Sequence, residues 1–225
     1  EGLYYVDKTM FIAHVLENPS RVQLYTRPRR FGKTLTAQML EAYYCKTGDS
    51  HAMFAPFEIA KDPSFETHLN KYEVISFDVQ TFMLEGQDIT KFIDRIRSAI
   101  HKELAAVWPN ILKNKKLELP EELSLIADQT GTKFVFIIDE WDAIFRNRPN
   151  DTVTQNAWIH FLRDLFKQKS SEKYIALAFL TGILPVKKYK TQSSLNNFKE
   201  YTMIRPKQLS PYVGFTISEV RDLCA

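Results

Sequence analysis

The chain has 225 residues, of which 44% are hydrophobic and 25% charged, a composition typical of an ordinary globular protein. Its formal net charge of +3 is too small to indicate a nucleic acid partner by itself. It contains no apolar run of membrane-spanning length, no signal peptide, and no metal-type spacing of its two cysteines with a histidine. We therefore expect a reduced, cytoplasmic chain with no membrane partner. Because it begins at Glu1 rather than Met, we also expect that an upstream segment has been lost.

Strand and helix patterns alternate along the first half of the chain. Residues 22–25 predict a short strand, and residues 33–44 predict a helix. The predicted inner face of this helix consists of Leu35, Met39, Leu40 and Tyr43. Residues 72–79 predict a second strand. Residues 88–108 predict a long amphipathic helix that buries Phe92, Ile96, Ile100 and Leu104.

The second half continues the alternation. Residues 110–119 are rich in Lys and Asn and predict a solvated loop before another helix. Residues 133–138 form a nearly continuous apolar run after Gly131, which is typical of a strand buried on both faces. Residues 152–168 predict a helix with Trp158, Phe161, Leu162, Leu165 and Phe166 facing inward. Residues 174–180 predict a fourth buried strand, and residues 201–204 a fifth. The fold class is therefore α/β, with a mostly parallel five-stranded sheet and helices on both faces.

The character of the chain changes after Leu209. Thr216 and Glu219 have the spacing of a capping box, which marks the start of a helix. We divide the chain into a core, residues 1–208, and the beginning of a truncated helical domain, residues 209–225.

A phosphate-binding loop is predicted between the first strand and the following helix. The segment is Arg27-Pro28-Arg29-Arg30-Phe31-Gly32-Lys33-Thr34, which ends in the Gly-Lys-Thr triplet of such loops. The helix start offers unpaired N–H groups to phosphate oxygens, and Gly32 lets the backbone approach them. Lys33, which we expect at a surface cleft, would reach the β- and γ-phosphates, and Thr34 would bind magnesium. The first glycine of the usual GxxxxGK[ST] pattern is replaced by Arg27, so the triplet alone is weak evidence.

Two acids at the end of the third strand strengthen this interpretation. Asp139 and Glu140 follow the buried run, and Thr181 follows the next strand. Because parallel α/β sheets bind ligands at the carboxyl ends of their strands, we expect all these groups at one site. Asp139 would hold the magnesium ion, and Thr181 would sense the γ-phosphate. The predicted catalytic residues are Glu140, as the general base that orients the attacking water, and Lys33. The predicted nucleotide contacts in and after the loop are Arg29, Arg30, Phe31, Gly32, Lys33, Thr34 and Leu35.

Several charged groups leave alternatives open. Arg27, Arg29 and Arg30 could cradle phosphates, contact a neighbouring subunit or be solvated. Asp142 is expected to orient the turn at Trp141 or to pair with a basic group rather than to bind metal. Residues 187–190 predict a solvated loop, with nucleic acid contact as the minor alternative.

In these motifs the chain resembles the predicted AAA-ATPase-like family of bacterial proteins. The resemblance continues through the segments Tyr5-Val6-Asp7-Lys8-Thr9, Ile138-Asp139-Glu140-Trp141-Asp142, Thr181-Gly182-Ile183, Leu195-Asn196-Asn197-Phe198 and Gly214-Phe215-Thr216. An arginine in place of the first loop glycine is usual in that family. Many members carry serine at the position of Thr34 and tyrosine at the position of Trp141, and both exchanges keep the needed chemistry.

The resemblance implies an ATP-binding P-loop domain of the additional-strand type, in which the sensor strand lies between the two motif strands. It also implies that Asp7 and Lys8 lie at the edge of the nucleotide. Family members often continue into a nuclease-like domain of the PD-(D/E)XK type, so nucleic acid is a possible partner through a domain that is absent from this chain. An oligomer is possible, although we find no decisive arginine finger among Arg146, Arg148 and Arg205.

The sequence therefore predicts a magnesium-dependent ATPase with ATP and Mg²⁺ as its ligands. The alternative is a nucleotide-gated regulatory switch that binds ATP with little turnover. A GTPase is disfavoured because no Asn-Lys-x-Asp motif follows the later strands. A small-molecule kinase would need an acceptor pocket that the sequence does not reveal.

Overall fold

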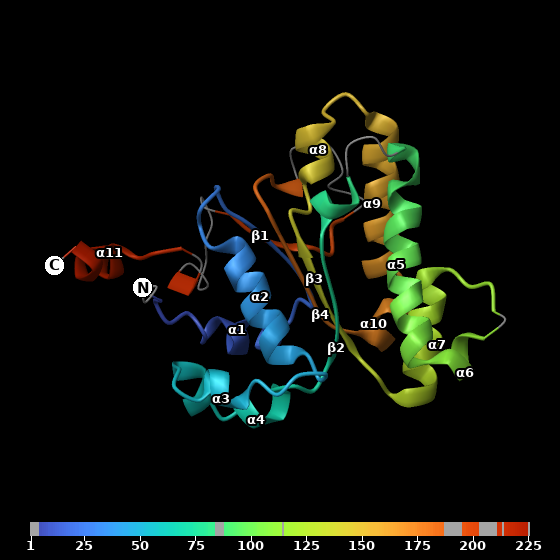
Figure 1. Cartoon of the computed structure of the whole chain (residues 1–225). Coiled ribbons are helices and arrows are strands. Elements are labelled where there is room, and N and C mark those ends of the chain that lie inside the picture. Colours follow the sequence, from blue (N-terminus) through green and yellow to red (C-terminus); the bar gives the residue numbers. More distant parts are fainter. Residues whose placement is uncertain are drawn as a thin grey trace.

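The computed structural model describes residues 5–83, 88–113, 115–186, 195–202, 211–212 and 214–224. Five parallel strands form one sheet in the order β2-β3-β4-β1-β5 (Figure 1). In chain order they are β1 (Val22–Thr26), β2 (Glu73–Asp78), β3 (Phe134–Asp139), β4 (Ile175–Gly182) and β5 (Lys199–Tyr201). The predicted fifth strand starts earlier than expected, and its residues 203–204 lie outside the described part of the chain.

The sheet is buried on both faces because helices cover each side. One face carries α1 (Phe11–Glu17), α2 (Lys33–Tyr44), α3 (His51–Phe54) and α4 (Phe65–His68), as Figure 1 shows. The other face carries α5 (Phe92–Val107), α6 (Pro109–Leu112), α7 (Leu119–Thr130), α9 (Thr152–Phe166) and α10 (Ser171–Tyr174). The short helix α8 (Ala143–Asn147) follows β3. Three 3₁₀ turns, η1 (Glu58–Lys61), η2 (Val79–Phe82) and η3 (Ile89–Lys91), complete these layers.

Strand β3 shows why the apolar run of the sequence had to be continuous. All six of its residues are buried. Phe134, Phe136 and Ile138 belong to the core under α5 and α9, whereas Val135 and Ile137 belong to the core under α1 and α2. Successive side chains of a strand point to opposite faces, so a strand with helices on both sides needs apolar residues at every position.

Most helix predictions agree with the structure. Helix α2 has the predicted bounds, and the predicted inner faces of α5 and α9 are buried. Leu35 is an exception, because its side chain is 56% exposed on the first turn of α2 instead of lying in the core. The segment 110–119 was predicted as a loop, but its start belongs to α6 and its end opens α7.

The last helix, α11 (Ile217–Cys224), has the predicted capping box. Thr216 Oγ1 accepts a hydrogen bond from the Glu219 N–H at 3.3 Å, and Glu219 Oε2 accepts one from the Thr216 N–H at 2.7 Å. Lys8 joins this helix to the N-terminal segment, since its Nζ lies 2.5 Å from Glu219 Oε1 and 2.5 Å from the Pro211 carbonyl oxygen. The proposed domain boundary at 208–209 lies outside the described residues. Among the described helices, none is long and apolar enough to cross a membrane.

A glycine is needed at position 182, at the end of β4, because the side chains of Trp141 and Asp142 approach the backbone closely there. A Cβ atom at this position would lie 2.5 Å from Asp142 Oδ1 and 2.5 Å from Trp141 Cδ1. Both of these side chains are fully buried. Trp141 is fixed further by its Nε1–H, which donates to the Leu184 carbonyl at 3.1 Å, so it has little freedom to move away.

We therefore predict that Gly182→Ala lowers the free energy of unfolding by about 1–3 kcal/mol through overpacking. Urea denaturation monitored by tryptophan fluorescence measures the change. Gly48→Ala is the matched control, because a Cβ atom there has nothing within 4 Å. Equal stability of the two variants would contradict this account of Gly182.

Candidate active site

The loop between β1 and α2 turns sharply at Gly32. This residue has φ +69°, in the left-handed region that favours glycine, and it precedes the first residue of α2. No side chain caps the helix start, so the first amides of α2 face the loop without a side-chain acceptor. Arg30 also has a positive φ of 67°. Such a loop at a helix N-terminus is suited to hold an anion.

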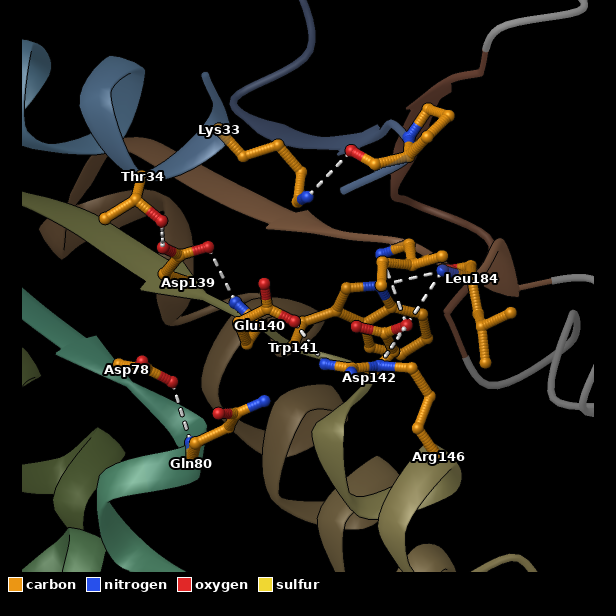
Figure 2. Close-up of polar contacts among 12 residues, drawn as sticks. Lys33, Thr34, Asp78, Gln80, Asp139, Glu140, Trp141, Asp142, Arg146 and Leu184 are labelled. Atoms are coloured by element: carbon orange, nitrogen blue, oxygen red, sulfur yellow. Dashed lines mark hydrogen bonds and ion pairs between the residues drawn. The ribbon is translucent and has the colours of Figure 1, made fainter. Parts of the chain in front are cut away.

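Lys33 lies beneath this loop rather than at the surface cleft that we expected. Its side chain is only 6% exposed. The Nζ atom donates to the Pro28 carbonyl oxygen at 3.1 Å. Figure 2 marks this bond of Lys33 with a dashed line. An ammonium group has three donors, so this bond leaves others for a phosphate oxygen.

The loop and the acidic strand meet in one direct contact. Thr34 Oγ1 donates to Asp139 Oδ2 at 2.6 Å, which joins residues 105 positions apart in the sequence (Figure 2). Asp139 is 7% exposed, and its Oδ1 accepts the Glu140 N–H at 2.8 Å. The hydroxyl and the carboxylate, which the sequence predicts as metal ligands, therefore lie side by side.

Glu140 occupies an unusual position at the end of β3. Its φ of +51° is in the left-handed region, a conformation that non-glycine residues adopt rarely and that is enriched at functional sites. Its carboxylate forms an ion pair with Arg146, and its side chain is largely shielded from solvent. Burial raises the pKa of the Glu140 carboxyl above its ordinary value, and the positive charge of Arg146 opposes that rise.

Thr181 lies at the end of β4, between the two motif strands. It is 1% exposed, and among the described residues its Oγ1 has no hydrogen-bond partner. Its carbonyl accepts the Trp141 N–H at 3.0 Å, and the Gly182 carbonyl accepts the Arg27 N–H at 3.0 Å. The end of β4 is thus bonded both to the turn after the acids and to the start of the phosphate-binding loop.

Arg27 has none of the three roles considered for it. Its side chain is 2% exposed, and Nη1 donates to the Thr26 carbonyl at 2.9 Å and the Tyr201 carbonyl at 3.0 Å. Burial lowers the pKa of the guanidinium. Arg27 therefore ties the end of β1 to the end of β5, whereas Arg29 and Arg30 are exposed beside the loop.

Asp7 is occupied by contacts within the N-terminal half. Its Oδ1 accepts the N–H and the hydroxyl of Thr9 at 2.8 and 2.7 Å, and its Oδ2 accepts the Glu58 N–H at 2.8 Å. These bonds fix the entry to α1 and η1. The adjacent Lys8, rather than Asp7, lines the pocket described next.

An apolar pocket of about 360 Å³ adjoins the loop. Three segments distant in sequence form its walls, which include Tyr5, Phe31, Leu35, Met39, Phe215 and Val220. Gly214, with φ +90°, lets the chain pass the Phe31 ring, because a Cβ atom there would lie 2.8 Å from Phe31 Cδ1. The sequence does not predict this pocket, since no spacing within one segment indicates it.

Asp142 pairs with a basic group, as expected. Its Oδ2 accepts a hydrogen bond from Arg146 Nε at 3.2 Å. Arg146 is thus engaged within its own chain with both Asp142 and Glu140. Of the other two arginines considered as fingers, Arg148 is exposed and Arg205 lies outside the described residues.

The oxygen donors of Thr34 and Asp139 fit magnesium, which proteins bind through one or two carboxylates plus substrate phosphates. Within the described part of the chain, no cluster of three His, Cys, Asp or Glu side chains could hold a metal alone. A metal at this site would thus take most of its ligands from the substrate and water.

One known family matches the part of the chain that contains this site. Residues 1–191 match the family described as Predicted AAA-ATPase, and the match includes the loop, the acidic strand and Thr181. No curated protein matches the chain. Since the match covers well over half of its residues, the chain belongs to the predicted AAA-ATPase family.

Proposed function

We propose that the protein binds ATP with magnesium and hydrolyses it to ADP and phosphate. The observation that carries the proposal is the contact between Thr34 and Asp139. It brings the end of the phosphate-binding loop to the acidic strand at the carboxyl edge of the sheet, where α/β proteins bind nucleotides.

The negative charge of the phosphates would be neutralised both by groups of the protein and by the bound magnesium ion. The amides at the start of α2 would hold the phosphate oxygens, and the Lys33 ammonium would reach the β- and γ-phosphates. Thr34 and Asp139 would hold magnesium, which when bound neutralises charge on the triphosphate. Arg29 and Arg30, exposed beside the loop, are further candidates for phosphate contacts.

Glu140 is the proposed base. Its carboxylate would orient a water molecule and take its proton, while the water oxygen bonds to the γ-phosphorus and the bond to the β,γ-bridging oxygen breaks. The proximity of Glu140 to both Asp139 and Lys33, whose charges act on its pKa, supports its place beside the phosphates. The hydroxyl of Thr181 is buried and has no hydrogen-bond partner in the part of the chain that the structure describes, which suits a sensor of the γ-phosphate.

The strand order supports the additional-strand class of P-loop ATPases. Strand β4, which carries Thr181, lies between β1 and β3, the strands that carry the two motifs. A group at the end of β4 is therefore a neighbour of both the phosphate-binding loop and the acids.

The apolar pocket is the proposed site of the adenine ring. Its walls are mostly aliphatic and aromatic, with Lys8 and Arg30 as charged lining residues. Its volume of about 360 Å³ is of the order that small ligands need, and it includes Gly32 of the loop and Thr36 of α2. Helix α11, whose Val220 lines the pocket, would then be the first helix of a domain that closes over the base.

The alternative function is a switch that binds ATP and rarely turns it over. The pairing of Glu140 with Arg146 is the observation that favours it, since this contact occupies one carboxylate oxygen of the proposed base. Turnover measurements separate the two functions.

Lys33→Met should weaken ATP binding about 10–100-fold, because it removes a charge-assisted hydrogen bond to phosphate but keeps the buried aliphatic stem. Titration calorimetry with Mg·ATP measures the affinity. Lys102→Met, at an exposed position of α5, is the control and should bind normally. Unchanged affinity in Lys33→Met would refute the role of this lysine.

Leu35→Asn should weaken ATP binding several-fold and leave binding of Mg·tripolyphosphate unchanged, because the substitution makes a wall of the base pocket polar without adding charge. Val153→Asn, on a side chain that is 76% exposed in α9, serves as the control. A similar loss of affinity for ATP and for Mg·tripolyphosphate would mean that Leu35 does not contact the base.

Glu140→Gln should bind Mg·ATP as the wild type does but release phosphate about 10²–10⁴-fold more slowly, since the amide cannot take a proton. Steady-state phosphate release in the presence and absence of magnesium is the measurement. Glu103→Gln, exposed on α5, is the matched control. Equal and slow release by the wild type and Glu140→Gln would favour the switch over the ATPase.

A further inference from the structure

Within the described segments, Arg146 is the basic residue that holds the carboxylate of Glu140. Arg146, on the short helix α8, places its Nη2 against Glu140 Oε2 (Figure 2). Both side chains are largely shielded, with 14% of Arg146 and 19% of Glu140 exposed. Among the described residues, no other side chain bonds to the Glu140 carboxylate, so Oε1 remains available for another partner.

Arg146 is itself fixed in direction. Its Nε donates to Asp142 Oδ2 at 3.2 Å, so one planar guanidinium spans two carboxylates. Asp142 is fully buried, and the same Oδ2 accepts the backbone N–H groups of Ile183 at 3.2 Å and Leu184 at 2.8 Å. A rigid guanidinium held through two of its nitrogen atoms cannot turn freely, unlike the point charge of a lysine.

The anchor of this arrangement is the chain that follows Thr181. Asp142 binds the amides two and three residues after Thr181, and Trp141 binds the carbonyls of Thr181 and Leu184. A continuous series of polar contacts therefore leads from Glu140 through Arg146 and Asp142 to the end of β4. The direction of the proposed base is set by the strand that carries the proposed γ-phosphate sensor.

We propose that Arg146 is a positioning residue for Glu140, an inference that rests on the proposed ATPase function. Arg146 holds Oε2 and leaves Oε1 to receive the proton of the attacking water. Among the described residues its side chain bonds to Glu140 and Asp142 and not to the proposed metal ligands Thr34 and Asp139, so it would act on turnover through Glu140 and leave nucleotide affinity unchanged. Two other roles are distinguishable from this one: a resting clamp that withholds Glu140, and a purely structural tie between α8 and Asp142.

The test compares wild type, Arg146→Ala, Arg146→Lys, Glu140→Gln and the double variant of Arg146→Ala with Glu140→Gln. Arg148→Ala is the matched control, because it removes an exposed arginine two residues away. Phosphate release gives kcat and KM, calorimetry gives the affinity for Mg·ATP, and urea denaturation gives stability.

A positioning role predicts that Arg146→Ala lowers kcat about 10–100-fold, which is less than the loss in Glu140→Gln, with the affinity for Mg·ATP unchanged within about twofold. Arg146→Lys should recover part of the lost turnover. Adding Arg146→Ala to Glu140→Gln should lower kcat no further, because a positioning residue has no effect once the base is gone. Arg148→Ala should behave as the wild type.

Faster turnover in Arg146→Ala would overturn the proposal in favour of the resting clamp. Unchanged turnover, additive losses in the double variant, or a loss of affinity in step with stability would overturn it in favour of a structural tie. Wild-type turnover no greater than that of Glu140→Gln would overturn the ATPase function as well. If Arg146→Ala does not fold, Arg146→Gln, which keeps a hydrogen-bonding side chain of similar reach, takes its place in every comparison.

Discussion

The site depends on one hydrogen bond, from the Thr34 hydroxyl to the Asp139 carboxylate. It exists because β1 and β3 run in the same direction with β4 between them, so the segments after the two strands emerge at the same edge of the sheet. The apolar run of β3 is needed for this geometry, since a central strand must be covered on both faces. The residues of β3 therefore fill the core on both faces of the sheet and also carry Asp139 to the site.

Buried polar groups, rather than apolar packing, hold the part of the site around Glu140 and Asp142 in place. Asp142 is fully buried, and its Oδ2 is compensated for the loss of water by hydrogen bonds from Arg146 and two backbone amides. Among the described residues, its Oδ1 has no hydrogen-bond partner. Gly182 makes room for Asp142 and Trp141 at the end of β4. The acids, the arginine and the end of β4 thus form one connected unit, which fixes the backbone of Glu140 in a conformation that it would not adopt alone.

Local patterns predicted the elements but not the contacts between distant segments. The bounds of α2 and the buried face of α5 follow from periodicity within one segment. Leu35 was misplaced because the first turn of α2 faces the pocket, where the apolar face of the helix has no core to pack against. The burial of Arg27 depends on the Tyr201 carbonyl, 174 positions away, which no spacing rule indicates. The pairing of Asp142 with Arg146 had a local signal, since residues four apart face each other on a helix.

The central claim is that the loop and the acids share one metal-bound triphosphate. A crystal structure with Mn²⁺ and a non-hydrolysable ATP analogue tests it most directly, because anomalous scattering locates the ion independently of the nucleotide. We expect one anomalous peak beside Thr34 Oγ1 and the Asp139 carboxylate, in contact with the phosphates. A peak at another edge of the sheet, or a triphosphate that does not reach Lys33, would contradict it.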